Sequence, residues 1–371
     1  MHSPRSPFAK AVDSAIKGSH TDAARNNWVK DWLNPGLAHP RFAVGRNAES
    51  LALNKHVPLS GILDDRHAGQ VWEGIPLVSF KEAPPDAWVM NCATSIAPVD
   101  VELALARQPF ERVLRLSDCL AQPNCPTALL PNFVSDQHQE LSRHMPAWEA
   151  LYKRLADDAS RQVLLDACRF RLTADPSYMN NYSVRLAEQY FEPFLQFHED
   201  VFVDAGAFDG DTTELFCMHA PTYRRVYLIE PSARNMAAAR KRLAHHSDIV
   251  FIQTGLSDQA GELAFDPDAG SASSVSGEGK ERILVDTLDT LIPEPATFIK
   301  MDLEGWELKA LAGSANHIRQ HKPALAIAVY HQASHFREVL DFVLNLHPDY
   351  KVRLGHYTQG WSETVMYFTE E

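Results

Sequence analysis

Three acidic residues stand at or just beyond the ends of apolar runs in the second half of this 371-residue chain: Asp204, Glu230 and Asp258. Asp204 ends the run VFVD, and Gly206 and Gly210 follow it before a stretch that can begin a helix. Glycine lets the backbone turn tightly and approach a ligand. The spacing is neither the G-x-G-x-x-G of a dinucleotide-binding turn nor the G-x-x-x-x-G-K-[ST] of a phosphate loop. We therefore expect a nucleotide-like ligand of another kind.

The charge of this loop argues against phosphates. It contains Asp204, Asp209 and Asp211, and no lysine or arginine stands between positions 201 and 216. A ligand with one carboxylate and a cationic centre fits better, because Thr212 or Thr213 can cap a helix whose N-terminus favours a carboxylate. S-adenosylmethionine, which has a carboxylate, an ammonium and a sulfonium, is such a ligand.

The two later acids extend the same site. Glu230 ends the run VYLI 26 residues after Asp204, and a carboxylate there can accept both ribose hydroxyls of an adenosine, as an acid about 20 residues past the glycine loop does in the related dinucleotide fold. Asp258, in QTGLSD, can accept from the adenine amino group. Taken singly, Glu230 could be a solvated acid and Asp258 a turn residue. The spacing of all three acids along the chain favours cofactor binding over these separate interpretations.

A second polar group follows the run TFIKM. Lys300 and Asp302 share one face of the expected strand, Glu304 follows at a turn, and the next strand ends at His331. Methyl transfer from sulfonium to oxygen is an in-line displacement in which alignment supplies much of the catalysis. A hydroxyl acceptor must also lose its proton, so a general base is useful. We expect His331 or Asp302 as the base, with Lys300 or Glu304 orienting.

Other interpretations of these residues stay open. Lys300 and Glu304 could form a structural ion pair, and His331 could merely close its strand. His331 and His335 could also ligate a metal together with Asp302, if His331 is already helical. The general base is favoured because such pairs arise by chance among 17 histidines, and no metal site is expected.

Two later features also have alternative interpretations. His356 and Trp361 are expected either to line the acceptor pocket or to pack in the interior. The Gly/Ser-rich insert DAGSASSVSGEGK is either a lid or a disordered surface loop.

These residues need a parallel sheet that brings several strand ends to one edge, because ligands bind beyond the carboxyl ends of open α/β sheets. The expected strands are 200–204, 225–229, 249–253, 297–302, 324–330, 351–356 and 364–368. The expected helices between them are Thr212–Cys217, Ala233–His245, Glu307–Arg319 and Phe336–Leu346.

The chain as a whole predicts four segments. Residues 1–40 form an N-terminal helical segment, and 41–135 form a Rossmann-like α/β domain in which strands alternate with helices. Residues 136–195 form a helical bridge, and 196–371 form the second α/β domain.

Several stretches together resemble the FkbM-type methyltransferases, a branch of the class I S-adenosylmethionine-dependent enzymes. They are VFVDAGAFDGDTTELF, VYLIEPSARN, GLSDQAGEL, VDTLD and FIKMDLEGWELKALAGS, and the most specific part is KMDLEGWELKALAG at 300–313. HKPALAIAVYH and RLGHYTQGWSETVMYF also look like that family. The resemblance covers about 195–371 and implies an α/β fold with a seven-stranded sheet, whose last strand is antiparallel.

The resemblance also implies roles for individual residues. The cofactor-binding residues would be Asp204, Gly206, Phe208, Gly210, Glu230 and, near the adenine, Asp258. Members commonly methylate hydroxyl groups of sugars or polyketide-like products. We therefore expect O-methylation of a carbohydrate or similar metabolite. The alternative is a non-catalytic nucleotide- or sugar-binding scaffold of a glycan pathway.

The N-terminal α/β segment is similar to the small nucleotide-binding-like domains that precede sugar acyltransferases and some FkbM-type chains. The similarity rests on FAVGRNAES and GILDDRHAGQVWEGIPLVSF. Only Gly45 stands where a glycine-rich loop would be. This favours a structural or substrate-presenting domain over a nucleotide site. It also argues against an NAD(P)-dependent oxidoreductase. Asp64 is the candidate ligand-contacting residue of this domain.

The composition limits partners and location. A formal net charge of −13 argues against nucleic acid and anionic membranes, since phosphate binding needs basic clusters. Five cysteines without a C-x-x-C suggest a reducing compartment. We find neither a signal-peptide core nor an apolar run near ~18 residues, and we expect a cytoplasmic protein. Its partner would be a small-molecule or glycan acceptor, and a homo-oligomer is left open.

Overall fold

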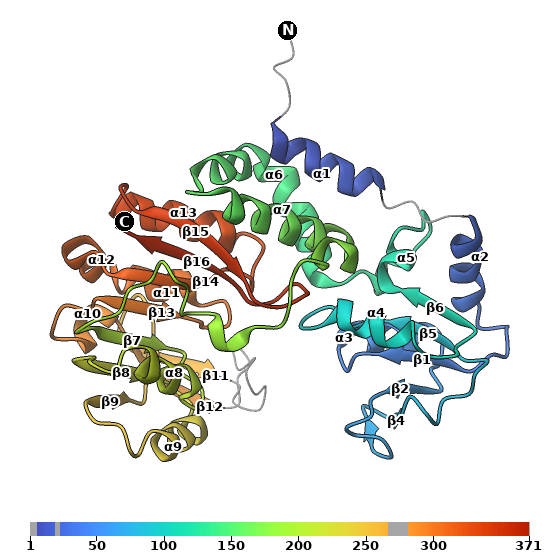
Figure 1. The fold of residues 1–371 in the computed structure, drawn as a ribbon, viewed down its shortest axis with the longest axis horizontal. Coiled ribbons are helices and arrows are strands. Elements are labelled where there is room, and N and C mark those ends of the chain that lie inside the picture. The colour runs from blue at the N-terminus through green and yellow to red at the C-terminus, as the bar shows by residue number, and fades with distance from the viewer. Residues whose placement is uncertain (1–5, 19–22, 266–280, 371) are drawn as a thin grey trace, which may run out of the picture. The chain divides into compact units, whose positions relative to one another are not determined.

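The computed structural model describes residues 6–18, 23–265 and 281–370, which fall into two compact units (Figure 1). Unit 1 consists of Met1–Tyr152, Gln162–Val184 and Tyr357–Ser362. Unit 2 consists of Lys153–Arg161, Arg185–His356 and Glu363–Glu371. The Gly/Ser-rich insert expected to be a lid or a loop lies outside the described residues.

Unit 1 contains a six-stranded sheet with the order β3-β4-β2-β1-β5-β6. The strands are β1 (Arg41–Val44), β2 (Gly61–Leu63), β3 (Val71–Trp72), β4 (Ile75–Val78), β5 (Trp88–Asn91) and β6 (Arg112–Arg115). All neighbours are parallel except β3 and β4. Strands β1, β2 and β5 are buried along their whole length, as parallel strands covered on both faces are. This is the smaller Rossmann-like sheet expected from the sequence.

The other regular elements described up to Glu188 are helices and short 3-10 turns. They are α1 (Pro7–Gly18), α2 (Ala23–Trp32), α3 (Ala48–His56), α4 (Pro98–Leu105), α5 (Leu116–Leu120), α6 (Asn132–Arg154) and α7 (Asp158–Thr173), with 3-10 turns at Thr127–Leu129, Pro176–Met179 and Leu186–Glu188. In the region expected to form the helical bridge, the last α-helix ends at Thr173. Asp175 precedes a proline, and the residue before a proline disfavours the α-helical conformation. Helix α6 is kinked at His144, two residues before Pro146.

The segment Tyr357–Ser362 joins unit 1 from near the C-terminus. The Gln359 N–H donates to the Ile96 carbonyl over 2.8 Å, and the Gln359 side chain accepts from the Asp100 N–H over 2.9 Å. Trp361 stacks on Phe133 with a centroid distance of 5.9 Å. This segment from late in the sequence therefore packs within unit 1, whose other residues all come from the first half of the chain.

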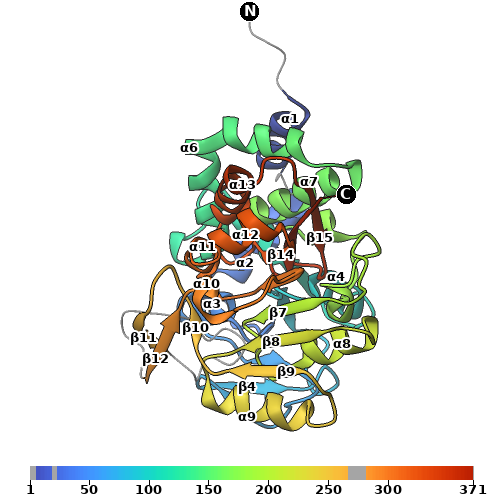
Figure 2. The ribbon, with the colours of Figure 1, turned by 90° about the vertical axis from the view of Figure 1, so that its left-hand side faces the viewer.

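Unit 2 contains a seven-stranded sheet with the order β15-β16-β14-β13-β7-β8-β9 (Figure 1), and its strands β14, β7, β8 and β9 can be followed in Figure 2. Its strands are β7 (Val201–Ala205), β8 (Arg225–Ile229), β9 (Ile249–Ile252), β13 (Phe298–Met301), β14 (Ala324–Ala328), β15 (Lys351–His356) and β16 (Thr364–Thr369). Only β16 runs antiparallel to its neighbours. The expected seven strands with an antiparallel last strand are confirmed.

A smaller sheet and six helices complete the described part of unit 2. The sheet has the order β10-β12-β11, formed by β10 (Gly255–Leu256), β11 (Gly261–Phe265) and β12 (Glu281–Asp286). The helices are α8 (Asp211–His219), α9 (Ala233–Arg242), α10 (Leu288–Leu291), α11 (Glu307–Ala312), α12 (Ala315–His321) and α13 (His335–Leu346). No helix in the described ranges is both long and apolar enough for a bilayer crossing.

The prediction of a single helix over Glu307–Arg319 is wrong, because the helix is interrupted at Gly313, between α11 and α12. A Cβ on Gly313 would lie 2.0 Å from the Ser257 carbonyl oxygen. Only glycine permits this approach of two backbones.

Stacked phenylalanines anchor the two strands that carry the site. Phe202 on β7 stacks on Phe216 of α8 and on Phe298 of β13, with centroid distances of 4.3 and 5.0 Å, and all three are buried. The carboxyl ends of β7 and β13 are thus fixed side by side by the core beneath them.

Candidate active site

The loop between β7 and α8 is shaped by its two glycines. Gly206 has φ +75°, and a Cβ there would lie 1.9 Å from the Asp302 carbonyl oxygen. Gly210 has φ +84° and would bring a Cβ to 3.0 Å from the Leu243 side chain. Both positions combine a left-handed conformation with a close approach, which only glycine accepts without strain. The loop therefore presents backbone rather than side chains at these two points.

A buried ion pair supports this loop from the sheet side. Lys300 Nζ lies 3.0 Å from Asp204 Oδ1 and donates to the Gly206 carbonyl over 2.7 Å, while Thr213 Oγ1 donates to Asp204 Oδ2 over 2.7 Å. Burial lowers the pKa of Lys300, but the Asp204 and Asp302 carboxylates outweigh it, and the net shift is upward. The alternative pairing of Lys300 with Glu304 is wrong, because Lys300 points into the sheet toward β7. The geometry thus gives Asp204 a positioning role, and direct cofactor contact by it stays a prediction.

Glu230, immediately after β8, contacts the same loop. Its Oε2 accepts from the Phe208 N–H over 3.1 Å, and its Oε1 accepts from the Ser232 N–H over 2.9 Å. Burial raises the pKa of Glu230. The structure therefore brings together Glu230, Phe208 and the glycines, as expected, while contact with the ribose stays a prediction.

Asp258 follows the short strand β10 and is one-third exposed. Its Oδ2 lies 2.6 Å from Lys309 Nζ, and its Oδ1 accepts from the Ser257 hydroxyl over 3.1 Å. These contacts fix the carboxylate at the edge of unit 2, and its role toward an adenine stays a prediction.

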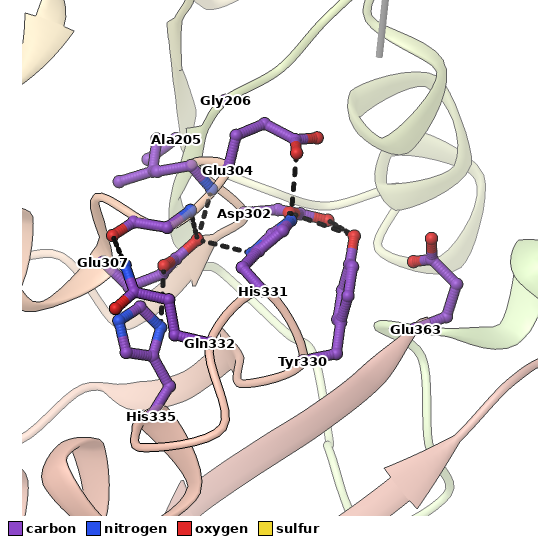
Figure 3. A network of polar contacts seen from close by, with 12 residues as sticks. Ala205, Gly206, Asp302, Glu304, Glu307, Tyr330, His331, Gln332, His335 and Glu363 are labelled. Carbon is purple, nitrogen blue, oxygen red and sulfur yellow. Dashed lines mark hydrogen bonds and ion pairs between the residues drawn. The ribbon is translucent and has the colours of Figure 1, made fainter. Parts of the chain in front are cut away.

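Asp302, Glu304 and His331 meet beyond β13 and β14 (Figure 3). His331 Nε2 lies 3.5 Å from Asp302 Oδ1 and 3.2 Å from Glu304 Oε2. The Asp302 N–H donates to the Ala205 carbonyl over 3.1 Å, so this cluster is one backbone hydrogen bond from the glycine loop. Three of the four residues expected to be catalytic are thus brought together, whereas Lys300 lies beneath the loop.

Glu307, at the first turn of α11, is a site residue that the sequence analysis missed. It is fully buried, and its carboxylate lies 3.1 Å from His331 Nδ1 and 3.2 Å from His335 Nδ1. Burial would raise the pKa of Glu307, but the two histidines hold it well below its usual range. Conversely, Glu307 leads the carboxylates that raise the pKa of His331 despite its burial. The carboxylate therefore lies within ion-pair distance of both imidazoles.

The metal pair proposed for His331 and His335 does not form. Helix α13 begins at His335, so His331 precedes the helix, and both rings turn one nitrogen to Glu307. The condition under which the two histidines could ligate one ion is therefore not met.

Two tyrosines and a glutamate complete the cluster, and the sequence analysis assigned a role to none of them. The Tyr190 hydroxyl donates to Asp302 Oδ2 over 3.0 Å, and the Tyr330 hydroxyl donates to Asp302 Oδ1 over 3.4 Å. Glu363 accepts from the Gln189 side chain over 2.7 Å. Burial, reinforced by the Asp302 carboxylate, raises the pKa of Glu363 to about 7. Tyr330 had a sequence signal in its place at a strand end, whereas Tyr190 and Glu363 stand in irregular segments without a pattern.

His356, Trp361 and Asp64 lie outside these clusters. His356 is buried and its Nδ1 lies 2.8 Å from Thr364 Oγ1, while Trp361 packs in unit 1, so both fit the packing interpretation. Asp64, just after β2, lies 3.0 Å from both Arg46 and His67. A ligand role for Asp64 stays a prediction.

Residues 204–352 match the family described as Methyltransferase FkbM domain. This chain carries an FkbM methyltransferase domain. A methyltransferase FkbM from Methylobacillus flagellatus KT is similar over 98% of this chain and 98% of that chain, with 25% sequence identity and a TM-score of 0.75. The expected family, the class I methyltransferase fold and S-adenosylmethionine as its cofactor are confirmed.

More distant structures match about half of this chain. A precorrin-6y C5,15-methyltransferase from Geobacter metallireducens GS-15 shares 11% identity over 54% of this chain and 89% of that chain, with a TM-score of 0.32. A fibrillarin from Aeropyrum pernix with natively bound S-adenosyl-L-methionine shares 13% over 52% and 76%, with a TM-score of 0.34. A search of the curated proteins found no match.

Proposed function

We propose that this FkbM methyltransferase transfers a methyl group to a hydroxyl of a carbohydrate or a similar hydroxylated metabolite. The observation that carries the proposal is the cluster of Asp302, Glu304 and His331, which is joined to the glycine loop by the Asp302 N–H. A hydroxyl that approaches this cluster would meet hydrogen-bonding groups on one side and the cofactor loop on the other.

The residues of the loop fit S-adenosylmethionine. Gly206 and Gly210 keep the loop free of Cβ atoms where space is needed, and a stretch without lysine or arginine suits a ligand that carries a sulfonium rather than phosphates. Glu230 is fixed beside Phe208, with a carboxylate that can accept from ribose hydroxyls. When bound, the cofactor supplies the methyl group on a positively charged sulfur.

The acceptor proton has two candidate bases, and the electrostatics favour Asp302. Burial lowers the pKa of His331, but the carboxylates of Glu307, Glu304 and Asp302 outweigh it and raise that pKa well above its usual range, which makes the imidazole the weaker candidate for the base. Asp302 is partly exposed, and its Oδ2 accepts a hydrogen bond from the Tyr190 hydroxyl. We therefore assign the role of general base to Asp302. His331 and Glu304 would orient the acceptor.

Calorimetry with S-adenosylmethionine and S-adenosylhomocysteine tests the cofactor half of this proposal. The Glu230→Ala variant is expected to bind at least ~10-fold more weakly with an unchanged circular dichroism spectrum, since it loses hydrogen bonds to a charged acceptor worth about 1.5–3 kcal/mol each. The matched control is Asp349→Asn, an exposed acid of the same unit. If the wild-type protein binds neither compound, the proposal is wrong.

Transfer of a labelled methyl group to a panel of sugars and other hydroxylated metabolites tests the acceptor half. Incorporation into an ether is expected, whereas incorporation only into amines or thiols would contradict the proposal. Cofactor binding without transfer to any acceptor would favour the non-catalytic scaffold instead.

The proposal also includes partners and location. The acceptor is a small molecule or glycan rather than a nucleic acid or a membrane, which the net charge of −13 supports. A cytoplasmic location is supported by the five cysteines, all of which are free thiols. Both a monomer and a homo-oligomer are compatible with this function.

A further inference from the structure

The cluster of Asp302, Glu304 and His331 has the dimensions of a metal site. One ligand atom from each residue lies within 4.8 Å of the other two, and His331 Nε2 is 3.5 and 3.2 Å from the nearest carboxylate oxygens. Ligands at neighbouring positions around one ion, with bonds of about 2.1 Å, are ~3.0–3.5 Å apart. We propose that Asp302, Glu304 and His331 bind one divalent metal ion, which would receive the acceptor hydroxyl. This inference rests on the function proposed above.

The far side of the imidazole supplies a second, independent observation. His331 Nδ1 lies 3.1 Å from Glu307, whose carboxylate is fully buried and accepts from the Leu303 and Gly305 N–H groups over 2.8 and 3.3 Å. Both ring nitrogens of His331, which is only 8% exposed, lack a hydrogen-bond partner among the described residues, so Nε2 is a buried nitrogen that can take an ion, and Glu307 stands beside the other nitrogen as a carboxylate commonly does in metal-binding histidines. In Figure 3 the ring accordingly lies between Glu307 on one side and the Asp302 and Glu304 carboxylates on the other.

The charges around the cluster also call for a cation. Asp302 and Glu304 lie near the carboxylates of Glu307, which is buried, and Glu363, and the base in direct contact with Asp302 and Glu304 is His331. Lys300, the lysine beneath the loop, is already paired with Asp204. Several carboxylates with reduced access to water need a compensating positive charge, and a bound ion can be the largest local charge in such a site.

The donor set indicates the kind of ion. Carboxylate oxygens suit Mg²⁺, Ca²⁺ and Mn²⁺, whereas imidazole suits transition metals. Two carboxylates with one imidazole therefore favour Mn²⁺ or a similar first-row ion. The Asp302 and Glu304 side chains are 17% and 24% exposed, so further coordination positions are accessible to water or to the acceptor.

Such an ion would select acceptors with two neighbouring hydroxyls, because both oxygens can bind one metal. As a Lewis acid it would lower the pKa of the hydroxyl. That oxygen then forms the new bond to the methyl carbon as the carbon–sulfur bond breaks. The hydroxyl proton passes to Oδ2 of Asp302, and S-adenosylhomocysteine leaves.

Mn²⁺ binding to the full chain tests the inference. After removal of adventitious metal with a chelator, electron paramagnetic resonance is expected to show one Mn²⁺ site in the wild-type protein. Asp302→Asn and Glu304→Gln are each expected to weaken it at least 10-fold, and Glu307→Gln by about 10–100-fold, the range typical of a residue that orients a ligand. The Glu304→Gln variant is the most informative, because Glu304 is partly exposed and its replacement is expected to disturb folding least.

A second cluster provides the matched control. In the described residues one other group has ligand atoms this close, Glu214 with His245 and His246. Glu214→Gln and His245→Asn are expected to leave the Mn²⁺ affinity unchanged. The inference is overturned if these variants, rather than those at Asp302 and Glu304, abolish binding.

The remaining outcomes separate this inference from the proposed function. S-adenosylhomocysteine binding is measured for the wild type and for every variant in the presence of chelator. A variant that binds it with wild-type affinity is correctly folded. Absence of that binding in the wild type overturns the proposed function. If the cofactor product binds but Mn²⁺ does not, or if methyl transfer to a vicinal diol is equally fast after chelation, only the metal site is wrong.

Discussion

Replacement of Lys300 by methionine tests whether the buried ion pair with Asp204 supports the cofactor loop. Methionine keeps an unbranched, flexible apolar side chain but removes the ammonium. Asp204 then keeps its hydrogen bond from Thr213 and loses its cation. The Gly206 carbonyl loses the donor that lies 2.7 Å away.

The size of the effect follows from burial and distance. The two side chains are 4% and 0% exposed and lie 3.0 Å apart, so their attraction is about 5.5 kcal/mol at an effective dielectric constant of about 20. Removal of one partner of a buried pair typically costs about 3–5 kcal/mol, because the other charge stays buried. Asp204→Asn together with Lys300→Met removes both charges, so we expect it to cost about 2–3 kcal/mol less than the sum of the single changes.

Urea unfolding followed by circular dichroism measures these free energies. The two units need not unfold together, so hydrogen exchange of peptides that cover 201–216 and 298–306 assigns the loss to the loop. Lys309→Met is the matched control, since its pair with Asp258 has side chains 53% and 33% exposed. An exposed pair of this kind contributes only about 0–1 kcal/mol.

Two results would refute this reasoning. One is additivity of the two single changes within ~0.5 kcal/mol, which would mean that the charges do not interact. The other is unchanged hydrogen exchange of 201–216 in the Lys300→Met variant, which would mean that the lysine does not support the loop.

Three further predictions concern the loop and the cluster. Gly206→Ala is expected to weaken S-adenosylhomocysteine binding more than 10-fold in calorimetry, because its Cβ would collide with the Asp302 carbonyl at 1.9 Å; wild-type affinity would contradict the close approach. The pKa of Glu307 is lowered in the fold, so its stabilisation is complete above the unfolded value of about 4.3 and is lost as the pH falls toward the folded one. The melting temperature should therefore fall below about pH 5 in the wild type and fall less steeply in Glu307→Gln, and parallel curves would refute this. His331→Asn is expected to lower kcat at least ~100-fold with S-adenosylhomocysteine affinity within twofold, and a loss of cofactor affinity instead would place His331 in the wrong half of the site.

The sheet and its edge could be predicted from the sequence because the signals are local. Strands β7, β8 and β13 stand out as mostly apolar runs, and the positions of Asp204, Glu230 and Asp302 at or just beyond their ends follow from those runs. The glycines of the loop were recognisable because a turn and a close approach both demand glycine. The family resemblance then implied the seven-stranded sheet and the antiparallel direction of its last strand.

The partners within the site could not be predicted because pairing depends on tertiary contacts. Lys300 and Glu304 are close in sequence, yet Lys300 pairs with Asp204, on a strand about 100 residues earlier. Glu307 looked like an ordinary acid of the first helical turn, and its burial against two histidines is visible only once β14 and α13 are in place. The break at Gly313 likewise depends on the distant Ser257 carbonyl.

The membership of Tyr357–Ser362 in unit 1 has a consequence for the order in which this protein matures during synthesis. Chains generally fold domain by domain from the N-terminus as they emerge, but unit 1 lacks the partners of Asp100 and Phe133 until residues 359–361 have been made. Most of unit 1 precedes unit 2 in the sequence, yet unit 1 is completed only by residues 357–362. The ribosome must therefore pass residue 362 before unit 1 is whole, and it must pass β16 at Thr364–Thr369 before the methyltransferase sheet is whole, so the two units become complete within a few residues of each other.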